Sequence, residues 1–290
     1  MGQDSDENKK VTNSQQNKQF QPIGPALKLA LISISAALYA AAIGITSPIS
    51  TPWGVGQFRP GVVFPSIFAI VYGPLVGGLG AAIGTFVGDI VFLAPLGLTT
   101  PLISLVAGVP GNFVGFYLMG WFIRKHRSWN GFVFGSFIAL LVGNLVCAVG
   151  VVGYLTLTLI WSGLSADALI GAIFGFTFFW LVTMIPFVVP LVPPMVKALQ
   201  PLVGSRIDFG LFGGKRDSGK EALKSSIYVG GILGILYLVV QFTPLGDSIF
   251  KSVTAPQYIP WLKLLFLIAA VVVTFFGIAA SLLLRPTNKK

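Results

Sequence analysis

Long apolar runs, separated by short polar stretches, follow the first 24 residues of the chain. Runs of about 20 apolar residues are long enough to cross the hydrocarbon core of a bilayer as helices. The longest run is interrupted at Gly73-Pro74, and proline disfavours a helical conformation at the residue before it. The pattern therefore predicts eight membrane segments, with the ranges 26–45, 60–72, 75–93, 101–123, 131–161, 168–192, 226–242 and 261–284.

The second of these segments, Pro60–Tyr72, is too short to cross a bilayer as a helix. A helix of this length spans about 20 Å, whereas the hydrocarbon core is about 30 Å thick. We therefore expect neighbouring helices to shield this segment, or the segment to be partly re-entrant.

Lysine and arginine are distributed unevenly over the polar stretches, and this asymmetry indicates the orientation. With eight spans, 16 basic residues fall on one side of the membrane, and only Arg59, Lys251 and Lys263 fall on the other. If the second and third segments formed one helix, the division would be 13 to 6. Because basic residues concentrate on the cytoplasmic side, we expect a multi-pass cell-membrane protein with both termini in the cytoplasm.

The composition agrees with this interpretation and excludes other classes of protein. Only 10% of the residues are charged and 54% are hydrophobic, whereas an ordinary soluble domain has about 25% charged residues. The net charge of +10 does not indicate a nucleic-acid partner, because the charges lie in loops rather than on one basic face. We predict an all-α integral membrane protein with a disordered cytoplasmic tail (1–24), a six-helix core (25–199), a basic cytoplasmic loop (200–225) and two additional C-terminal helices (226–290).

The chain has few residues that could perform chemistry. Cys147 is the only cysteine and His126 the only histidine, so a metal site built from these residue types is excluded. Cys147 lies in an apolar run and is interpreted as a packed thiol. Without a second membrane-embedded acid or a histidine, no general acid–base pair is available. We expect neither enzyme activity nor a cofactor nor a metal.

Two charged residues belong to the membrane segments or their edges. Asp89 is the only acidic residue within a predicted span, and Arg59 lies at the outer start of the second segment. Intramembrane carboxylates are candidates for a functional role. A pair between Arg59 and Asp89 would neutralise both charges at the outer rim of a pocket. The sequence equally allows a pair that only ties the second and third segments together.

Polar and aromatic residues add further candidates for ligand binding. Asn112 and Asn144 lie near the middle of two segments, where each needs hydrogen-bond partners; they either bond to each other or line a polar cavity. The loop 46–59 is long enough to fold over the mouth of a cavity, with aromatic residues that can stack on a flat ligand. Trp180 could equally face lipid. The predicted substrate-binding residues are Trp53, Gln57, Phe58, Arg59, Asp89, Asn112, Asn144, Tyr154 and Trp180.

Small residues form two adjacent stripes on the first segment. Such stripes let helix backbones approach closely within a membrane. Glycine stripes on other segments, such as Gly80/Gly84 and Gly230/Gly234, are interpreted as internal packing. The first segment has more small surface than one neighbour requires, so either internal packing or a partner-docking surface is possible there. The docking candidates are Ser33, Ala36, Ala37, Ala40 and Ala41.

Residues 25–199 resemble the substrate-binding (S) component of energy-coupling factor (ECF) transporters. One shared feature is the Ala-x-x-x-Ala spacing over residues 36–41, and another is the long loop into Arg59-Pro60. The run 64–89 is similar to the family's short helix, Gly-Pro turn and glycine-rich third helix that ends near an aspartate. The resemblance covers about 60% of the chain, and segments seven and eight depart from it because S components usually end after six helices.

This resemblance implies a receptor that binds a vitamin or similar micronutrient from outside the cell. It implies that the first loop covers the pocket and that the Ala-x-x-x-Ala face docks on a transmembrane coupling subunit associated with two ATPases. The pocket residues indicate a neutral or weakly charged ring system as the substrate. Two alternatives stay open: a solitary ion-coupled secondary transporter that uses Asp89 as its coupling site, and a membrane scaffold or assembly factor without a small ligand.

Overall fold

A computed structural model describes residues 23–47, 57–203, 218–251 and 254–284 of the chain. Within these residues the chain forms helices and no β-strand. The elements in chain order are α2 (Pro25–Thr46), η1 (Pro60–Val62), α3 (Val63–Tyr72), α4 (Pro74–Gly88), η2 (Asp89–Leu93), η3 (Ala94–Leu96), α5 (Pro101–Ile103), η4 (Ser104–Gly108), α6 (Val109–Lys125), α7 (Trp129–Leu157), α8 (Ala166–Val203), α9 (Ser218–Phe242), α10 (Pro244–Lys251), η7 (Pro256–Tyr258) and α11 (Ile259–Leu283).

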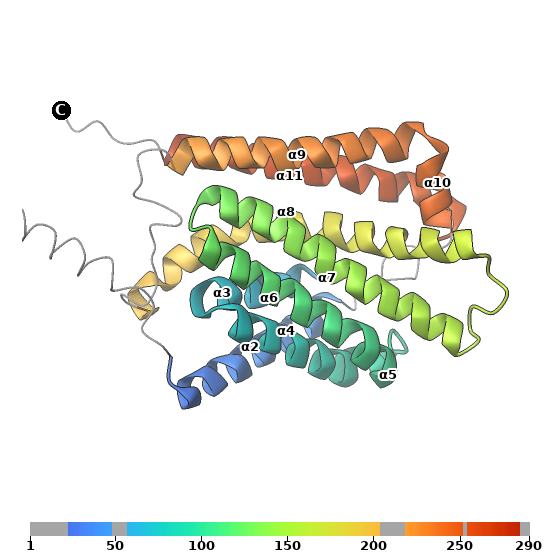
Figure 1. Ribbon diagram of the computed structural model, residues 1–290, viewed down its shortest axis with the longest axis horizontal. Coiled ribbons are helices and arrows are strands. Elements are labelled where there is room, and N and C mark those ends of the chain that lie inside the picture. Colours follow the sequence, from blue (N-terminus) through green and yellow to red (C-terminus); the bar gives the residue numbers. More distant parts are fainter. Residues whose placement is uncertain (1–22, 48–56, 204–217, 252–253, 285–290) are drawn as a thin grey trace, which may run out of the picture.

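The long helices are stacked side by side in the order of their contacts. Helix α2 packs against α4, α4 against α6, α6 against α7, and α7 against α8. Helices α9 and α11 pack against each other and contact α7 and α8, on the far side of the core from α2 (Figure 1). The two C-terminal helices therefore extend the core at one edge and leave the opposite edge to α2.

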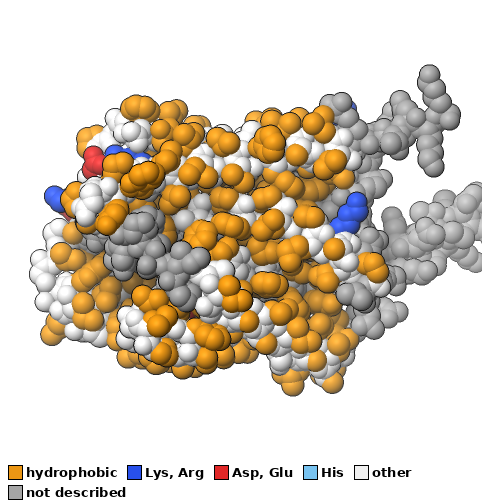
Figure 2. All heavy atoms as spheres, turned by 180° about the vertical axis from the view of Figure 1, so that it is seen from behind, with side chains coloured by type: hydrophobic (Ala, Val, Ile, Leu, Met, Phe, Trp, Pro, Cys, Tyr) orange, Lys and Arg blue, Asp and Glu red, His pale blue; other side chains and the backbone are white. Residues whose placement is uncertain are grey.

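The described helices fit a membrane protein in length and in surface. Seven of them are long and apolar enough to cross a bilayer, and Pro60–Tyr72 is a shorter apolar helix. Hydrophobic side chains cover most of the face shown in Figure 2, and charged side chains lie near its two ends. Such a surface would be costly in water but suits contact with lipid tails. The chain is an all-α, multi-pass membrane protein.

The short helix α3 is shielded by its neighbours, as its length predicted. Eight of its ten residues are buried, and it contacts α2, α4, α6 and α8. Its C-terminal end is bonded within the protein, because Arg124 of α6 donates a hydrogen bond to the Tyr72 carbonyl oxygen at 2.8 Å. A helix too short to reach both membrane surfaces is therefore held inside the protein rather than in lipid.

Gly73 makes the sharp turn between α3 and α4, with φ +102° and ψ 178°. Only glycine readily adopts these backbone angles. In addition, a Cβ atom at this position would collide with the Arg124 guanidinium. We expect Gly73→Ala to lower the free energy of unfolding by about 1–3 kcal/mol, measured by thermal unfolding in detergent. Gly231→Ala on α9 is the control, because its Cβ would meet open space; equal losses for both variants would contradict this account of the turn.

Several helix ends differ from the limits of the apolar runs. Helix α8 continues to Val203, and α9 begins at Ser218, whereas the sequence placed residues 200–225 in a loop. The reason is that apolar runs mark membrane spans, while the polar first turns of α9 continue the same helix beyond the span. Helix α10 (Pro244–Lys251) was not predicted, since eight residues are too few to form a span.

Most of the glycine stripes pack inside the protein, as predicted. Gly80 and Gly84 of α4 lie so close to α2 that added Cβ atoms would meet Ser35 and the Ala36 backbone. Gly230 packs in the same way on α11, but Gly234 does not, because nothing lies within 4 Å of a Cβ placed there. The interpretation of Gly234 as a packing residue is therefore wrong, whereas its neighbour Leu233 is fully buried, so Gly234 lies on another side of α9.

Candidate functional site

A cavity of about 210 Å³ lies among α6, α7 and α8, next to the connection between α4 and α6. Its lining combines an ion pair, two asparagine amides and several aromatic and aliphatic side chains. The polar or charged residues that line it are Gln57, Arg59, Asp89, Thr99, Ser104, Asn112 and Asn144. The larger apolar ones are Leu98, Ile103, Phe116, Leu140, Val151, Leu155, Phe176, Trp180 and Met184.

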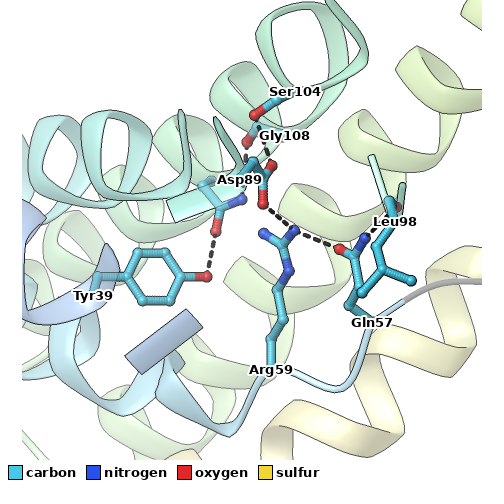
Figure 3. A network of polar contacts seen from close by, with 8 residues as sticks. Tyr39, Gln57, Arg59, Asp89, Leu98, Ser104 and Gly108 are labelled. Atoms are coloured by element: carbon cyan, nitrogen blue, oxygen red, sulfur yellow. Dashed lines mark hydrogen bonds and ion pairs between the residues drawn. The ribbon is translucent and has the colours of Figure 1, made fainter. Parts of the chain in front are cut away.

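The ion pair predicted between Arg59 and Asp89 is confirmed. Arg59 Nη2 lies 2.7 Å from Asp89 Oδ1 (Figure 3), and the two residues are 8% and 2% exposed. The second carboxylate oxygen, Oδ2, accepts a hydrogen bond of 2.7 Å from the Ser104 hydroxyl. Both carboxylate oxygens therefore have strong donors, and the two buried charges neutralise each other.

Two wide helical turns bring these groups together. Asp89 begins the five-residue π-helical segment η2, and Ser104 begins the second such segment, η4. A π-turn inserts one residue into a helix and so redirects the side chains around it, which is why such turns are frequent at functional sites. Ser104 was not among the predicted residues, because no sequence pattern links it to Asp89.

Gln57 extends the same network toward the surface. Its Oε1 atom accepts a hydrogen bond of 2.6 Å from Arg59 Nη2, and its Nε2 atom donates to the Leu98 carbonyl oxygen at 2.9 Å (Figure 3). Gln57 thus joins the end of the first loop to the stretch between η3 and α5. The prediction that Gln57 lies at the cavity agrees with this position.

The two asparagines line the cavity. They do not bond to each other, and each has a different hydrogen-bond partner. Asn112 accepts a hydrogen bond from the Tyr39 hydroxyl at 3.1 Å and donates to the Gly108 carbonyl at 2.9 Å. Asn144 donates to the Met184 sulfur at 3.6 Å, and a thioether is a weak acceptor. Of the two alternatives from the sequence, the structure favours the polar cavity. Of these two amides, Asn144 makes the fewer and weaker hydrogen bonds.

Stacked aromatic rings form one wall of the cavity. Phe176 and Trp180 stack with ring centroids 5.3 Å apart, and Trp161 stacks on Phe176 at 6.4 Å. Trp180 is 8% exposed and lines the cavity, so it does not face lipid. Phe176 was not predicted, although its spacing of four residues from Trp180 places both on one face of a helix.

Other predicted residues lie away from the cavity or outside the described chain. Phe58 packs edge to face on Phe187, with ring centroids 5.4 Å apart, and Tyr154 is half-buried but does not line the cavity. Trp53 lies outside the described residues. Cys147, interpreted as a packed thiol, lines the cavity beside Asn144 and is only partly buried.

The predicted docking residues divide into two groups. Ala36 and Ala40 are buried, at 6% and 4% exposure, and the backbone of Ala36 lies against Gly84 of α4. They are therefore corrected to internal packing residues, since a buried side chain is not open to a partner. Ser33, Ala37 and Ala41 are exposed along α2.

Among the described residues, no group of three or more His, Cys, Asp or Glu side chains is placed to hold a metal ion. The cavity thus combines hydrogen-bonding groups and rings suited to recognising a small molecule. Its one charged pair is internally neutralised.

Comparison with known proteins places this cavity in a functional context. Residues 26–192 match the family described as ECF-type riboflavin transporter, S component. The matched stretch runs from α2 into α8 and contains every residue that lines the cavity from residue 57 to residue 184. No curated protein and no solved structure matches the chain. Because the match covers more than half of the 290 residues, the chain belongs to the ECF-type riboflavin transporter S components and is a substrate-specific membrane subunit of an ECF transporter.

Proposed function

We propose that this S component captures a flat, uncharged heteroaromatic vitamin from outside the cell, and that riboflavin is the first candidate. The bound form would dock on a transmembrane coupling subunit that is associated with two ATPases. The observation that carries the proposal is the cavity itself. It joins an aromatic wall, a weakly bonded amide and a neutralised ion pair in one partly open cavity.

The charge balance of the cavity supports an uncharged ligand. Arg59 and Asp89 are its charged lining residues, and they pair at 2.7 Å. A ligand with a net charge would have to leave water and enter this site without a compensating partner, which is costly in a poorly hydrated environment. Hydroxyl and carbonyl groups can instead share the donors and acceptors of the existing network.

The other lining groups match the chemistry of a flavin. Riboflavin has a fused ring system with carbonyl and N–H groups on one edge and a hydroxylated side chain. Phe176 and Trp180 offer faces for ring stacking, and Asn144 can exchange its weak bond to Met184 for a ligand carbonyl or N–H. The hydroxylated chain would then point toward Arg59 and Ser104.

The volume of the cavity has a consequence for binding. At about 210 Å³ it is smaller than the roughly 300–1,000 Å³ of typical ligand pockets. A vitamin of riboflavin's size therefore requires the cavity to widen. The link from Gln57 to the Leu98 carbonyl is a contact that such an opening would break.

Helix α2 is the proposed docking surface for the coupling subunit. Ser33, Ala37 and Ala41 form an exposed stripe of small side chains, and such stripes permit close contact between helices in a membrane. Helices α9 and α11 lie at the opposite edge of the core (Figure 1). The C-terminal pair therefore leaves this stripe open.

The two alternative functions receive less support from the site. An ion-coupled transporter that uses Asp89 would need a carboxylate free to bind a proton or cation, but both oxygens of Asp89 already accept hydrogen bonds from Arg59 and Ser104. A scaffold without a small ligand gives no reason for a cavity lined by amides and stacked rings.

Cys147 provides a direct test, because the only cysteine of the chain lines the cavity. Methyl methanethiosulfonate should modify Cys147 slowly in the ligand-free protein in detergent, and saturating riboflavin should reduce that rate at least about tenfold by filling the space around the sulfur. The rate is measured by mass spectrometry of the intact protein.

Two controls define the outcome of this experiment. Cys147→Ser should show no modification, and the cationic vitamin thiamine should give no protection, because the neutralised pair offers no counter-charge. Unchanged labelling in the presence of riboflavin would contradict riboflavin as the substrate. Mass spectrometry of a ligand that co-purifies with the protein would then identify the vitamin.

A further inference from the structure

A second cavity lies at the end of the C-terminal helix pair, where α9 leads through α10 into α11. Its volume is about 370 Å³, and it is separate from the cavity described above. Three of its lining residues are apolar and four are polar or charged. They are Pro256, Ile259 and Pro260, and Gln241, Asp247, Lys251 and Lys263.

Lys263 is the most unusual of these residues. It belongs to the apolar span Pro256–Leu283, its side chain is only 10% exposed, and its Nζ atom lies 2.8 Å from Asp247 Oδ1. Charged residues within membrane helices are expensive and are commonly functional. An ammonium group has three donors, and the Asp247 carboxylate, with a side chain that is 63% exposed, occupies one of them.

The surrounding residues place this cavity at the level of lipid headgroups. Trp261 is 63% exposed on the first turn of α11, and Tyr258 immediately precedes that helix. Tryptophan and tyrosine gather where a membrane meets water. Helix α10 packs Ile249 and Phe250 against the protein and leaves Leu245 exposed, so this end of the helix pair presents apolar as well as charged side chains.

We propose that this cavity binds the phosphate of a phospholipid headgroup. Lys251 and Lys263 bring two positive charges to a cavity with one carboxylate, Asp247, so the site has an excess of one positive charge. The donors of Lys263 that Asp247 does not occupy are available to phosphate oxygens, which form strong charge-assisted hydrogen bonds. The walls formed by Pro256, Ile259 and Pro260 suit the glycerol and upper acyl chain.

The proposal is tested with the full-length protein in detergent micelles supplemented with dioleoyl-phosphatidylglycerol. Native mass spectrometry should detect one tightly retained lipid, and the lipid should raise the thermal unfolding temperature. Lys251→Gln should weaken lipid binding about fivefold, the effect of removing one cation near a phosphate. Lys263→Gln should weaken it further. Lys251 is exposed, so its variant tests the site even if Lys263→Gln fails to fold.

The controls separate the phosphate from the acyl chains and from a general effect of charge. Lys224→Gln removes an exposed lysine from the opposite end of α9, where its ammonium lies 5.9 Å from the Tyr228 ring, and should bind the lipid like the wild type. Dioleoylglycerol, which lacks the phosphate, should not bind. Equal binding of dioleoylglycerol, or unchanged binding in Lys251→Gln, would overturn the proposal. An equal thermal shift with inorganic phosphate would overturn the assignment to lipid.

Discussion

Replacing Arg59 with methionine is expected to lower the free energy of unfolding by about 3–5 kcal/mol, because it leaves a buried carboxylate without its cation. The partner, Asp89, is only 2% exposed and lies 2.7 Å from the guanidinium. Denaturant or thermal unfolding in detergent measures the loss. The same change should weaken riboflavin binding at least about tenfold, the equivalent of one lost hydrogen bond to a charged group.

The double variant Arg59→Met/Asp89→Asn separates stability from recognition. Both charges are removed, and the amide oxygen introduced at position 89 can still accept a hydrogen bond from Ser104. The free energy of unfolding should therefore return to within about 1 kcal/mol of the wild type. Ligand affinity should stay low if the pair contacts the ligand. Recovery of both properties would show that the pair only ties the start of η1 to η2 and would remove it from the binding site.

Replacing Ala37 and Ala41 together with leucine is expected to abolish coupled uptake while leaving riboflavin affinity within about twofold of the wild type. Two bulky side chains on a close helix contact cost about 1 kcal/mol each at least, which corresponds to roughly thirtyfold weaker docking. Both residues are exposed on α2 and do not line the cavity. Uptake is measured in cells that express the remaining transporter subunits, and affinity on purified protein.

Gly231→Leu/Gly234→Leu provides the matched control for the docking surface. These two glycines of α9 also face open space, but they lie at the opposite edge of the core from α2 (Figure 1). Uptake should therefore be normal in this variant. Normal uptake in the α2 variant, or loss of uptake only in the α9 variant, would contradict docking through α2.

The helices and the ion pair could be predicted from the sequence for clear physical reasons. Apolar runs of about 20 residues have few alternatives to a membrane helix, because backbone groups in lipid must bond internally. Gly73-Pro74 marks the break that separates α3 from α4. Arg59 and Asp89 were expected to pair because an isolated charge in these surroundings is too costly, and they do.

The rotation of each helix could not be predicted in the same way. In water an apolar stripe marks the side that faces the core, but lipid tails are as apolar as a leucine side chain. The protein-facing and lipid-facing sides of α2 are therefore equally apolar, and two small-residue stripes were equally good candidates for the contact with α4. The glycines of α4 decided the matter, because their lack of side chains lets Ser35 and Ala36 of α2 pack against Gly80 and Gly84.

Local sequence patterns were sufficient to predict a membrane protein, its short shielded helix and the ion pair between Arg59 and Asp89. The uncharged side chains that hydrogen-bond to this pair or line the cavity beside it were identified only from the packed helices. Hydrogen bonds between distant segments leave no local pattern in the sequence. Ser104 reaches Asp89 because each begins a π-turn, and Asn144 lies opposite the Met184 sulfur because α7 and α8 are neighbours. Helices fold from local patterns, whereas a cavity forms from the angles and offsets at which they pack.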